Sequence, residues 1–347
     1  MLTMASARRL GITCTLAVLL LLCCASTAGA TFPGRNGEIV ISSWPQPVES
    51  PAFDSSLTFI NPRTGRARRL ALCPAVRIYP SSQCEGRGAA AVSPDGQEFA
   101  FVMGDGTAAY HAPTRYLLSV LPHGGGPAVK HALIDRPQDP VYPSYDGLRW
   151  SPDGSRLVLD GWEDEGTNQL SFVRTDGRLT GRIIKNASSP DWSPDGRLAF
   201  VRYANPFDTQ SGDLFVGKPS GRFRRLTRKG GDGPSWSPDS RKIAFSRDGG
   251  ISLVSSRGGK ARRLVKHGPL VETFGGPPTY AYSAVAPVWS PDGKQLVFIR
   301  AFHRRQNSYV YTLNLRTKKL RLLNAGIQPS DQVFSLDWRP LPAPSSR

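Results

Sequence analysis

The chain has 347 residues, and its 44 lysines and arginines outnumber its 27 aspartates and glutamates, which gives a formal net charge of +17. A field of this sign suggests anionic partners such as wall polymers, lipid headgroups or nucleic acid. The one long apolar run lies at the N-terminus and is too short to be a retained membrane span, so the mature chain is predicted to have no transmembrane segment.

Residues 1–30 have the order of a secretory signal peptide: two arginines, an apolar run and then the small residues Ala28-Gly29-Ala30. We expect cleavage after Ala30, which leaves residues 31–347 as a mature domain that is secreted or held in the periplasm or cell-wall space. The arginine pair leaves the export route open between the general secretory and the twin-arginine systems. Export argues against nucleic acid as the partner.

One phrase recurs along the chain at intervals of 42 to 58 residues, which is the signature of a repeat architecture. Ser, Pro, Asp and Gly suit the four positions of a type I turn in that order, so each copy predicts a β-hairpin. The copies are Val92-Ser93-Pro94-Asp95-Gly96, Trp150-Ser151-Pro152-Asp153-Gly154, Trp192-Ser193-Pro194-Asp195-Gly196, Trp236-Ser237-Pro238-Asp239-Ser240 and Trp289-Ser290-Pro291-Asp292-Gly293.

An apolar triplet follows each turn, as in Leu157-Val158-Leu159 and Ile243-Ala244-Phe245. Strands that are apolar at successive positions are buried on both faces, so each unit is predicted to lie between two neighbours. A third apolar strand and a fourth strand, which reads Arg-Arg-Leu in three units, complete four antiparallel strands. Stacked units of this kind are the blades of a β-propeller.

The two ends of the chain complete the count of blades. Residues 32–41 resemble the second half of the repeat without its first strand, and residues 334–340 match the approach to the turn and then stop. One blade is therefore predicted to be shared by both termini, which closes the ring. Five internal units and this composite predict an all-β, six-bladed β-propeller, and a closed ring with few exposed edges favours a monomer.

The Trp-Ser-Pro-Asp-Gly phrases with their apolar triplets resemble the WD40-like (PD40) repeats of the TolB propeller family, over essentially all of residues 32–340. The resemblance implies a six-bladed propeller that serves as a protein-binding platform, with an envelope or secreted protein as its partner. The blades begin directly after the predicted signal peptide, without the α/β domain that precedes the propeller in TolB proteins.

Two of the five cysteines, Cys73 and Cys84, lie outside the predicted signal peptide. They are eleven positions apart and flank a loop that contains Pro, Ser and Gly. In an oxidising compartment this arrangement predicts one disulfide, and neither the spacing nor nearby histidines support a metal or redox pair.

Much of the positive charge falls in the fourth strands, which form the outer edges of the blades. Charge at such an edge prevents edge-to-edge aggregation, and we favour this explanation. Binding of an anionic wall polymer is the alternative. The residues concerned are Arg66, Arg68, Arg69, Arg222, Arg224, Arg225, Lys260, Arg262, Arg263, Lys318, Lys319 and Arg321.

Strand parity places the long connections on one side of the disc, which we call the long-loop face, and the tight turns on the other. Binding residues concentrate on loops that a rigid scaffold holds, and the connection His267 to Tyr282 is the longest between blades. Aromatic and charged patches on this face suit a protein interface, and ordinary solvated loop tips are the alternative. The candidates are Trp162, Glu163 and Asp164; Phe274, Tyr280 and Tyr282; and His303 and Arg304.

Four residues are predicted to face the central channel: Arg149, Asp191, Ser235 and Asp337, each next to the tryptophan position of its unit. They are candidates for binding a ligand or an ion. The alternative is that they hold water and hydrogen-bond to neighbouring strands. The five aspartates of the repeated phrase are explained by turn chemistry.

The sequence contains no Gly-x-Ser-x-Gly elbow, no His-Glu-x-x-His, no calcium loop and no phosphate loop, and it indicates no cofactor and no metal site. We therefore predict a non-catalytic propeller that binds a protein or an envelope component through its long-loop face. The alternative is an enzyme of the metal-dependent lactonase or lyase type that uses the channel, with Asp191 and Asp337 as ligands or acid/base groups.

Overall fold

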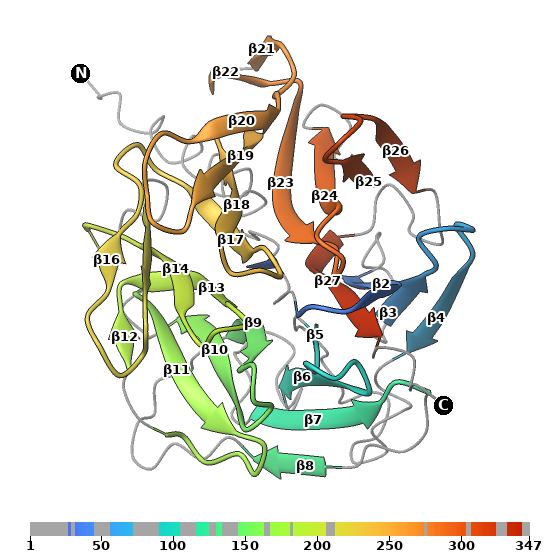
Figure 1. Cartoon of the computed structure of the whole chain (residues 1–347), viewed down its shortest axis with the longest axis vertical. Helices are drawn as coiled ribbons and strands as arrows, with labels where there is room; N and C mark the ends of the chain where they lie inside the picture. The colour runs from blue at the N-terminus through green and yellow to red at the C-terminus, as the bar shows by residue number, and fades with distance from the viewer. Residues whose placement is uncertain are drawn as a thin grey trace, which may run out of the picture.

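Six four-stranded antiparallel sheets surround a common axis in the computed structural model (Figure 1). The structure describes residues 27–28, 32–44, 56–71, 90–104, 116–124, 130–133, 145–162, 167–180, 183–205, 212–273, 276–302, 307–323 and 332–341. These residues form strands, turns and bends and contain no helix, so none of them forms a helix that could cross a membrane.

Each blade consists of four strands, named from the innermost outwards. Blade 1 consists of β27 (Gln332–Leu341), β2 (Arg35–Trp44), β3 (Ser56–Ile60) and β4 (Ala67–Ala71); blade 2 of β5 (Ala90–Val92), β6 (Glu98–Gly104), β7 (Tyr116–Pro122) and β8 (Lys130–Leu133); and blade 3 of β9 (Tyr145–Trp150), β10 (Arg156–Trp162), β11 (Asn168–Arg174) and β12 (Ile184–Lys185). Blade 4 consists of β13 (Ala187–Trp192), β14 (Leu198–Arg202), β15 (Asp213–Gly217) and β16 (Arg224–Arg225); blade 5 of β17 (Asp232–Trp236), β18 (Lys242–Arg247), β19 (Gly250–Ser255) and β20 (Arg262–Val265); and blade 6 of β23 (Tyr282–Trp289), β24 (Gln295–Phe302), β25 (Asn307–Asn314) and β26 (Leu320–Leu323).

The predicted closure of the ring is confirmed. β27 pairs antiparallel with β2, with Trp338 opposite Ile39 and Leu336 opposite Ile41, so the C-terminal strand is the innermost strand of the N-terminal blade. Neighbouring innermost strands contact one another all the way round, in the order β27, β5, β9, β13, β17 and β23. The axis is therefore enclosed by six strands that are far apart in the sequence.

The apolar triplets fill the space between blades, as their pattern predicts. Val158, Phe200 and Phe298 are each fully buried, and the five tryptophans of the units are at most 3 % exposed. The indole N–H of Trp150 donates to the carbonyl of Ala91 in the preceding blade at 3.1 Å. The indole of Trp289 donates to Ser235 in the same way. Each tryptophan of this kind contributes apolar area and a directed bond to one joint.

The repeated turn has the hydrogen bonds that its residues predict. In the copy at Ser193, the fourth residue Gly196 donates its N–H to the carbonyl of Ser193 at 3.0 Å, as in a type I turn. The Ser193 hydroxyl donates to Asp195 at 2.5 Å and accepts the N–H of Arg197 at 2.8 Å. The serine hydroxyl thus joins the turn to the strand that follows, which explains why a serine opens the phrase.

Two elements differ from the expectation. The connection from His267 to Tyr282, expected as an irregular loop, contains the hairpin β21 (Leu270–Thr273) and β22 (Gly276–Tyr280), which extends outward at the top of Figure 1. Its glycines and prolines obscured the β-branched residues on either side of the turn. A two-residue strand, β1 (Thr27–Ala28), is also present, within the segment expected to be a signal peptide.

Cys73 and Cys84 lie outside the described residues, as does most of the predicted signal peptide. The disulfide and the cleavage after Ala30 therefore stay predictions.

The turn glycines provide a test of how the closing strand is seated. Gly96 has a φ of 72°, and a Cβ there would lie 2.1 Å from the carbonyl oxygen of Pro340 in β27. Gly154 has a φ of 67° at the same turn position, but a Cβ there meets nothing within 4 Å. Gly154→Ala should cost about 1 kcal/mol of stability for its backbone conformation alone. Gly96→Ala should cost about 1–3 kcal/mol more, because the clash displaces β27.

Thermal unfolding of the two variants measures this difference directly. Equal losses of Tm would show that β27 does not pack against the turn of blade 2.

Candidate functional site

A ring of buried polar side chains lies on the innermost strands. In three blades, the residue before the tryptophan position accepts the backbone N–H of the equivalent tryptophan position in the next blade. These side chains are at most 1 % exposed, so each bond replaces solvent that the buried N–H group has lost. The bonds join Asp337 Oδ2 to Val92 N at 2.8 Å, Asp191 Oδ2 to Trp236 N at 2.7 Å and Ser235 Oγ to Trp289 N at 3.4 Å.

A second set of bonds uses β-bulges three positions before the tryptophan in blades 4, 5 and 6. The bulges at Ser189, Gly233 and Ala286 have φ values of 52°, 52° and 51°, which lie in the left-handed region. Each turns its N–H toward a side-chain acceptor. The acceptors are Asp160 Oδ2 for Ser189 at 2.7 Å, Asp232 Oδ1 for Gly233 at 2.7 Å and Ser246 Oγ for Ala286 at 3.1 Å.

Arg149 departs from this pattern. It occupies the first-set position of blade 3, where the other polar residues are acceptors, and it is fully buried. Its Nη1 donates to the carbonyl of Leu148, whereas Nε and Nη2 have no hydrogen-bond partner. None of the ion pairs among the described residues includes Arg149. A buried guanidinium without a paired carboxylate is costly, and such departures from a local rule mark candidate functional sites.

Three carboxylates share the field of Arg149 without touching it. Desolvation lowers the pKa of Arg149, and Asp337, Asp191 and Asp160 act in the opposite direction. Burial raises the pKa of Asp337 to about 6, with Arg149 and two backbone N–H groups opposing that rise. Burial also raises the pKa of Asp191 well above its usual range. Groups with such perturbed pKa values cluster at functional sites.

One further atom of this ring is unsatisfied. Asp191 Oδ1 is buried and has no hydrogen-bond partner, although Oδ2 accepts the N–H of Trp236. The axis therefore offers two donors on Arg149 and one acceptor on Asp191. A neutral group that both accepts and donates hydrogen bonds, such as water or a peptide unit, matches this set.

The four predicted channel residues thus come together, from β9, β13, β17 and β27. Sequence reasoning missed Asp160, which is the residue directly after the apolar triplet of blade 3. A polar residue at the end of an otherwise apolar strand was the available signal. It also missed the bulges, which leave no periodic mark in the sequence.

The long-loop face carries an aromatic cluster at the ends of the blade 6 strands. The guanidinium of Arg300 lies 4.5 Å from the ring centre of Tyr282 and 4.7 Å from that of Tyr311. The ring of Phe302 is 5.4 Å from Tyr282 and 5.5 Å from Tyr309. All five side chains are half-buried. Of these residues only Tyr282 was predicted, because Arg300, Phe302, Tyr309 and Tyr311 were assigned to strands.

The remaining predicted residues of this face are placed in part. Tyr280 stacks on His267 with ring centres 4.0 Å apart, at the base of the β21–β22 hairpin. The backbone of Trp162 ends β10, but its side chain lies outside the described part of the chain. The same holds for the whole of Glu163, Asp164, Phe274, His303 and Arg304.

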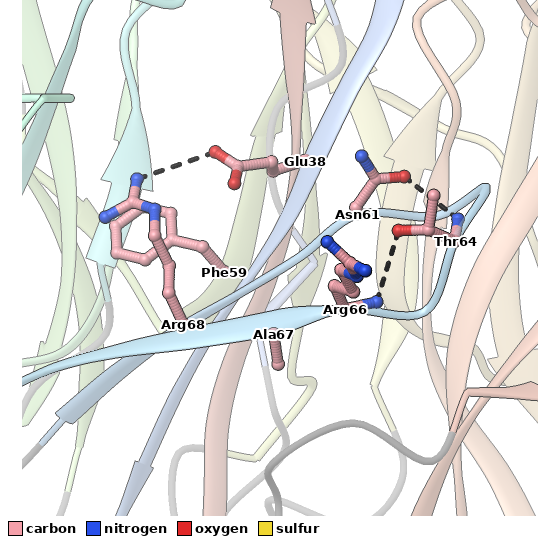
Figure 2. A pocket seen from close by; sticks show the side chains of 7 residues that line it. All are labelled: Glu38, Phe59, Asn61, Thr64, Arg66, Ala67 and Arg68. Carbon is pink, nitrogen blue, oxygen red and sulfur yellow. Dashed lines mark hydrogen bonds and ion pairs between the residues drawn. The ribbon is translucent and has the colours of Figure 1, made fainter.

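A pocket of about 520 Å³ lies on the opposite face, beside the turn between β3 and β4 (Figure 2). The guanidinium of Arg68 lies 3.8 Å from the ring centre of Phe59 and 3.5 Å from Glu38. His123 of blade 2 lies 2.7 Å from Glu38, and burial lowers the pKa of this histidine. Arg68 was predicted as a free edge charge, and the structure instead places it in a contact between blades 1 and 2.

Within the described ranges, no three histidine, cysteine, aspartate or glutamate side chains lie close enough together to hold a metal ion.

The raised pKa of Asp337 predicts a pH dependence of stability. Between its ordinary value of 3.8 and about 6, the folded protein keeps a proton that the unfolded chain has released. The free energy of unfolding that depends on Asp337 therefore falls as pH rises through this window, by on the order of 3 kcal/mol. Asp337→Asn cannot titrate, so its Tm should rise relative to wild type between pH 4 and pH 7.5.

Asp153→Asn is the matched control. The Ser151 hydroxyl lowers the pKa of Asp153, so this group titrates below the window. A Tm difference between Asp337→Asn and wild type that stays constant with pH would contradict the prediction.

Comparison with known proteins relates this fold to solved structures. No protein-family model matches the chain, and no curated protein matches it. TolB from Acinetobacter baumannii has a TM-score of 0.59 at 14% identity, over 89% of this chain and 68% of that one. A putative TolB from Agrobacterium tumefaciens has a TM-score of 0.55 at 19% identity, over 87% and 99%. A structure of the nidogen/laminin complex has a TM-score of 0.56 at 11% identity, over 88% and 99%. These similarities extend to the fold, which is that of the TolB-like six-bladed β-propellers.

Proposed function

We propose that this chain is an exported, non-catalytic binding propeller that contacts an envelope or secreted protein through its long-loop face. The observation that carries the proposal is the aromatic cluster of blade 6. Tyrosine, phenylalanine and arginine are enriched at protein interfaces, where large rings bury much area at a low cost in conformational entropy. The TolB-like fold supports the same function, and one similar structure is described as a complex of nidogen with laminin.

The geometry of the cluster suits this role. Arg300 lies between two rings, so its charge is stabilised without a carboxylate, and its head group is fixed before any partner arrives. Phe302 and Tyr309 meet edge to face at 88°, which fixes both rings. Side chains that are already ordered lose little entropy on binding, and this favours affinity.

An enzyme that uses the channel is the second candidate, because the pKa of Asp337 is near neutral. Two features oppose it. Both oxygens of Asp337 accept backbone N–H groups, at 2.8 Å from Val92 and 2.7 Å from Trp338, and the side chain is 1 % exposed. Arg149 also places a positive charge among the carboxylates, so these residues do not fit a metal cation. Turnover by the purified chain on a panel of lactones and sugar esters would favour the enzyme, as would a bound metal in elemental analysis.

The partner can be tested with the mature chain, residues 31–347, immobilised and exposed to solubilised envelope fractions at 150 and 500 mM salt. We expect one protein to be retained at both concentrations. Phe302→Ala with Tyr309→Ala should reduce its retention about 30-fold, since interface hot spots contribute about 2 kcal/mol or more. Leu320→Ala, an exposed apolar side chain on the outer strand β26, is the matched control and should leave retention unchanged.

Unchanged retention by the double variant, at an unchanged Tm, would remove the binding site from blade 6. Retention of an anionic polymer alone, lost at the higher salt, would assign binding to the arginines of the outer edges instead.

A further inference from the structure

The N-terminal strand β1 lies on the axis of the propeller. Thr27 pairs with Ser335 and Ala28 with Leu336, in parallel, so β1 is a fifth strand on the inner side of blade 1. It also contacts β9, β13, β17 and β23, the innermost strands of blades 3 to 6. A segment that precedes the first blade therefore occupies the centre of the ring.

The inner edge of β27 explains why a strand can add there. β27 pairs with β2 on its outer side, so its other edge presents backbone N–H and C=O groups to the axis. Such an edge pairs with any extended chain that can reach it, and main-chain hydrogen bonds then supply the affinity. The hydroxyl of Ser335 is engaged with the backbone of Ala90 in blade 2, which leaves pairing at this position to the backbone of β27.

Two strands beside β1 carry the unsatisfied atoms of the axis. Arg149 Nε and Nη2 belong to β9, and Asp191 Oδ1 belongs to β13. A strand paired on one edge still has N–H and C=O groups on its other edge, and these are the partners that an arginine and a carboxylate need. β1 leaves all three atoms without partners, so the segment fills the site only in part.

We propose that Thr27–Ala28 is a tethered occupant of an axial strand site, and that cleavage after Ala30 opens this site. The predicted cleavage point lies between β1 and β2, so processing would remove β1 and keep all six blades. The precursor is then closed at its axis. The mature chain is open there to an extended peptide backbone, which pairs with β27 and completes the hydrogen bonds of Arg149 and Asp191.

The test uses a fluorescent peptide with the sequence of residues 25–32 and two forms of the protein, residues 31–347 and residues 25–347. Fluorescence anisotropy should show saturable binding to residues 31–347. Binding to residues 25–347 should be at least tenfold weaker, because a tethered strand competes at a high effective concentration. The same peptide with proline in place of Ala28 is the control and should bind neither form, since proline cannot donate a backbone N–H group.

Hydrogen exchange places the peptide. The amides of Ser335 to Asp337 should exchange at least tenfold more slowly in residues 25–347, or with the peptide bound, than in free residues 31–347. Arg149→Met should weaken peptide binding about tenfold without lowering Tm, because it removes two donors and an unpaired buried charge.

Three results would each overturn the proposal. They are no binding to residues 31–347, equal binding to both forms, and binding that leaves the exchange of Ser335 to Asp337 unchanged. This test is independent of the long-loop face, since it contains neither envelope partner nor any change in blade 6.

Discussion

The pairing of β27 with β2 is the constraint on which the rest of the molecule depends. A stack of blades has two exposed ends, and only closure removes them. The same strand also provides Asp337 for the bond to blade 2, the carbonyl of Pro340 beside Gly96, and the edge on which β1 lies. Blade 1 is thus the joint of the ring and also the place where its axis is lined most fully.

The arginines of the outer edges and the turns serve as connections between blades. Each donates to a backbone carbonyl of the following blade, which satisfies an acceptor that the blade itself leaves free. A bond of this kind to a neutral carbonyl is less sensitive to salt than an ion pair between exposed side chains. The bonds run from Arg339 to Gly96 at 2.6 Å, Arg197 to Ser240 at 2.7 Å, Arg224 to Ser256 at 2.9 Å and Arg321 to Pro62 at 2.9 Å. Part of the net positive charge is therefore structural.

The fold could be predicted from the sequence because its determinants are local. Ser193, Pro194, Asp195 and Gly196 form their turn with one another, and the apolar triplets require only a neighbour of the same kind. The channel position of Asp191 followed from strand parity alone. The unsatisfied state of Arg149 could not be predicted, because it depends on distances between residues of four blades. The blade 6 cluster was missed for a related reason: the rings of Phe302 and Tyr309 meet across two strands, whereas the sequence separates them by a connection.

The way the ring closes also sets the order in which it can fold. Trp338 in β27 lies opposite Ile39 in β2, about 300 residues earlier in the chain. Contacts of such high sequence separation form slowly, because a long loop must close before they contribute any stability. During export the N-terminal end crosses first, so the edge of β2 stays unpaired until the strand that covers it has arrived. The interval between these events is the period in which the chain is most exposed to aggregation and to proteases, and its length is set by the rate of translocation.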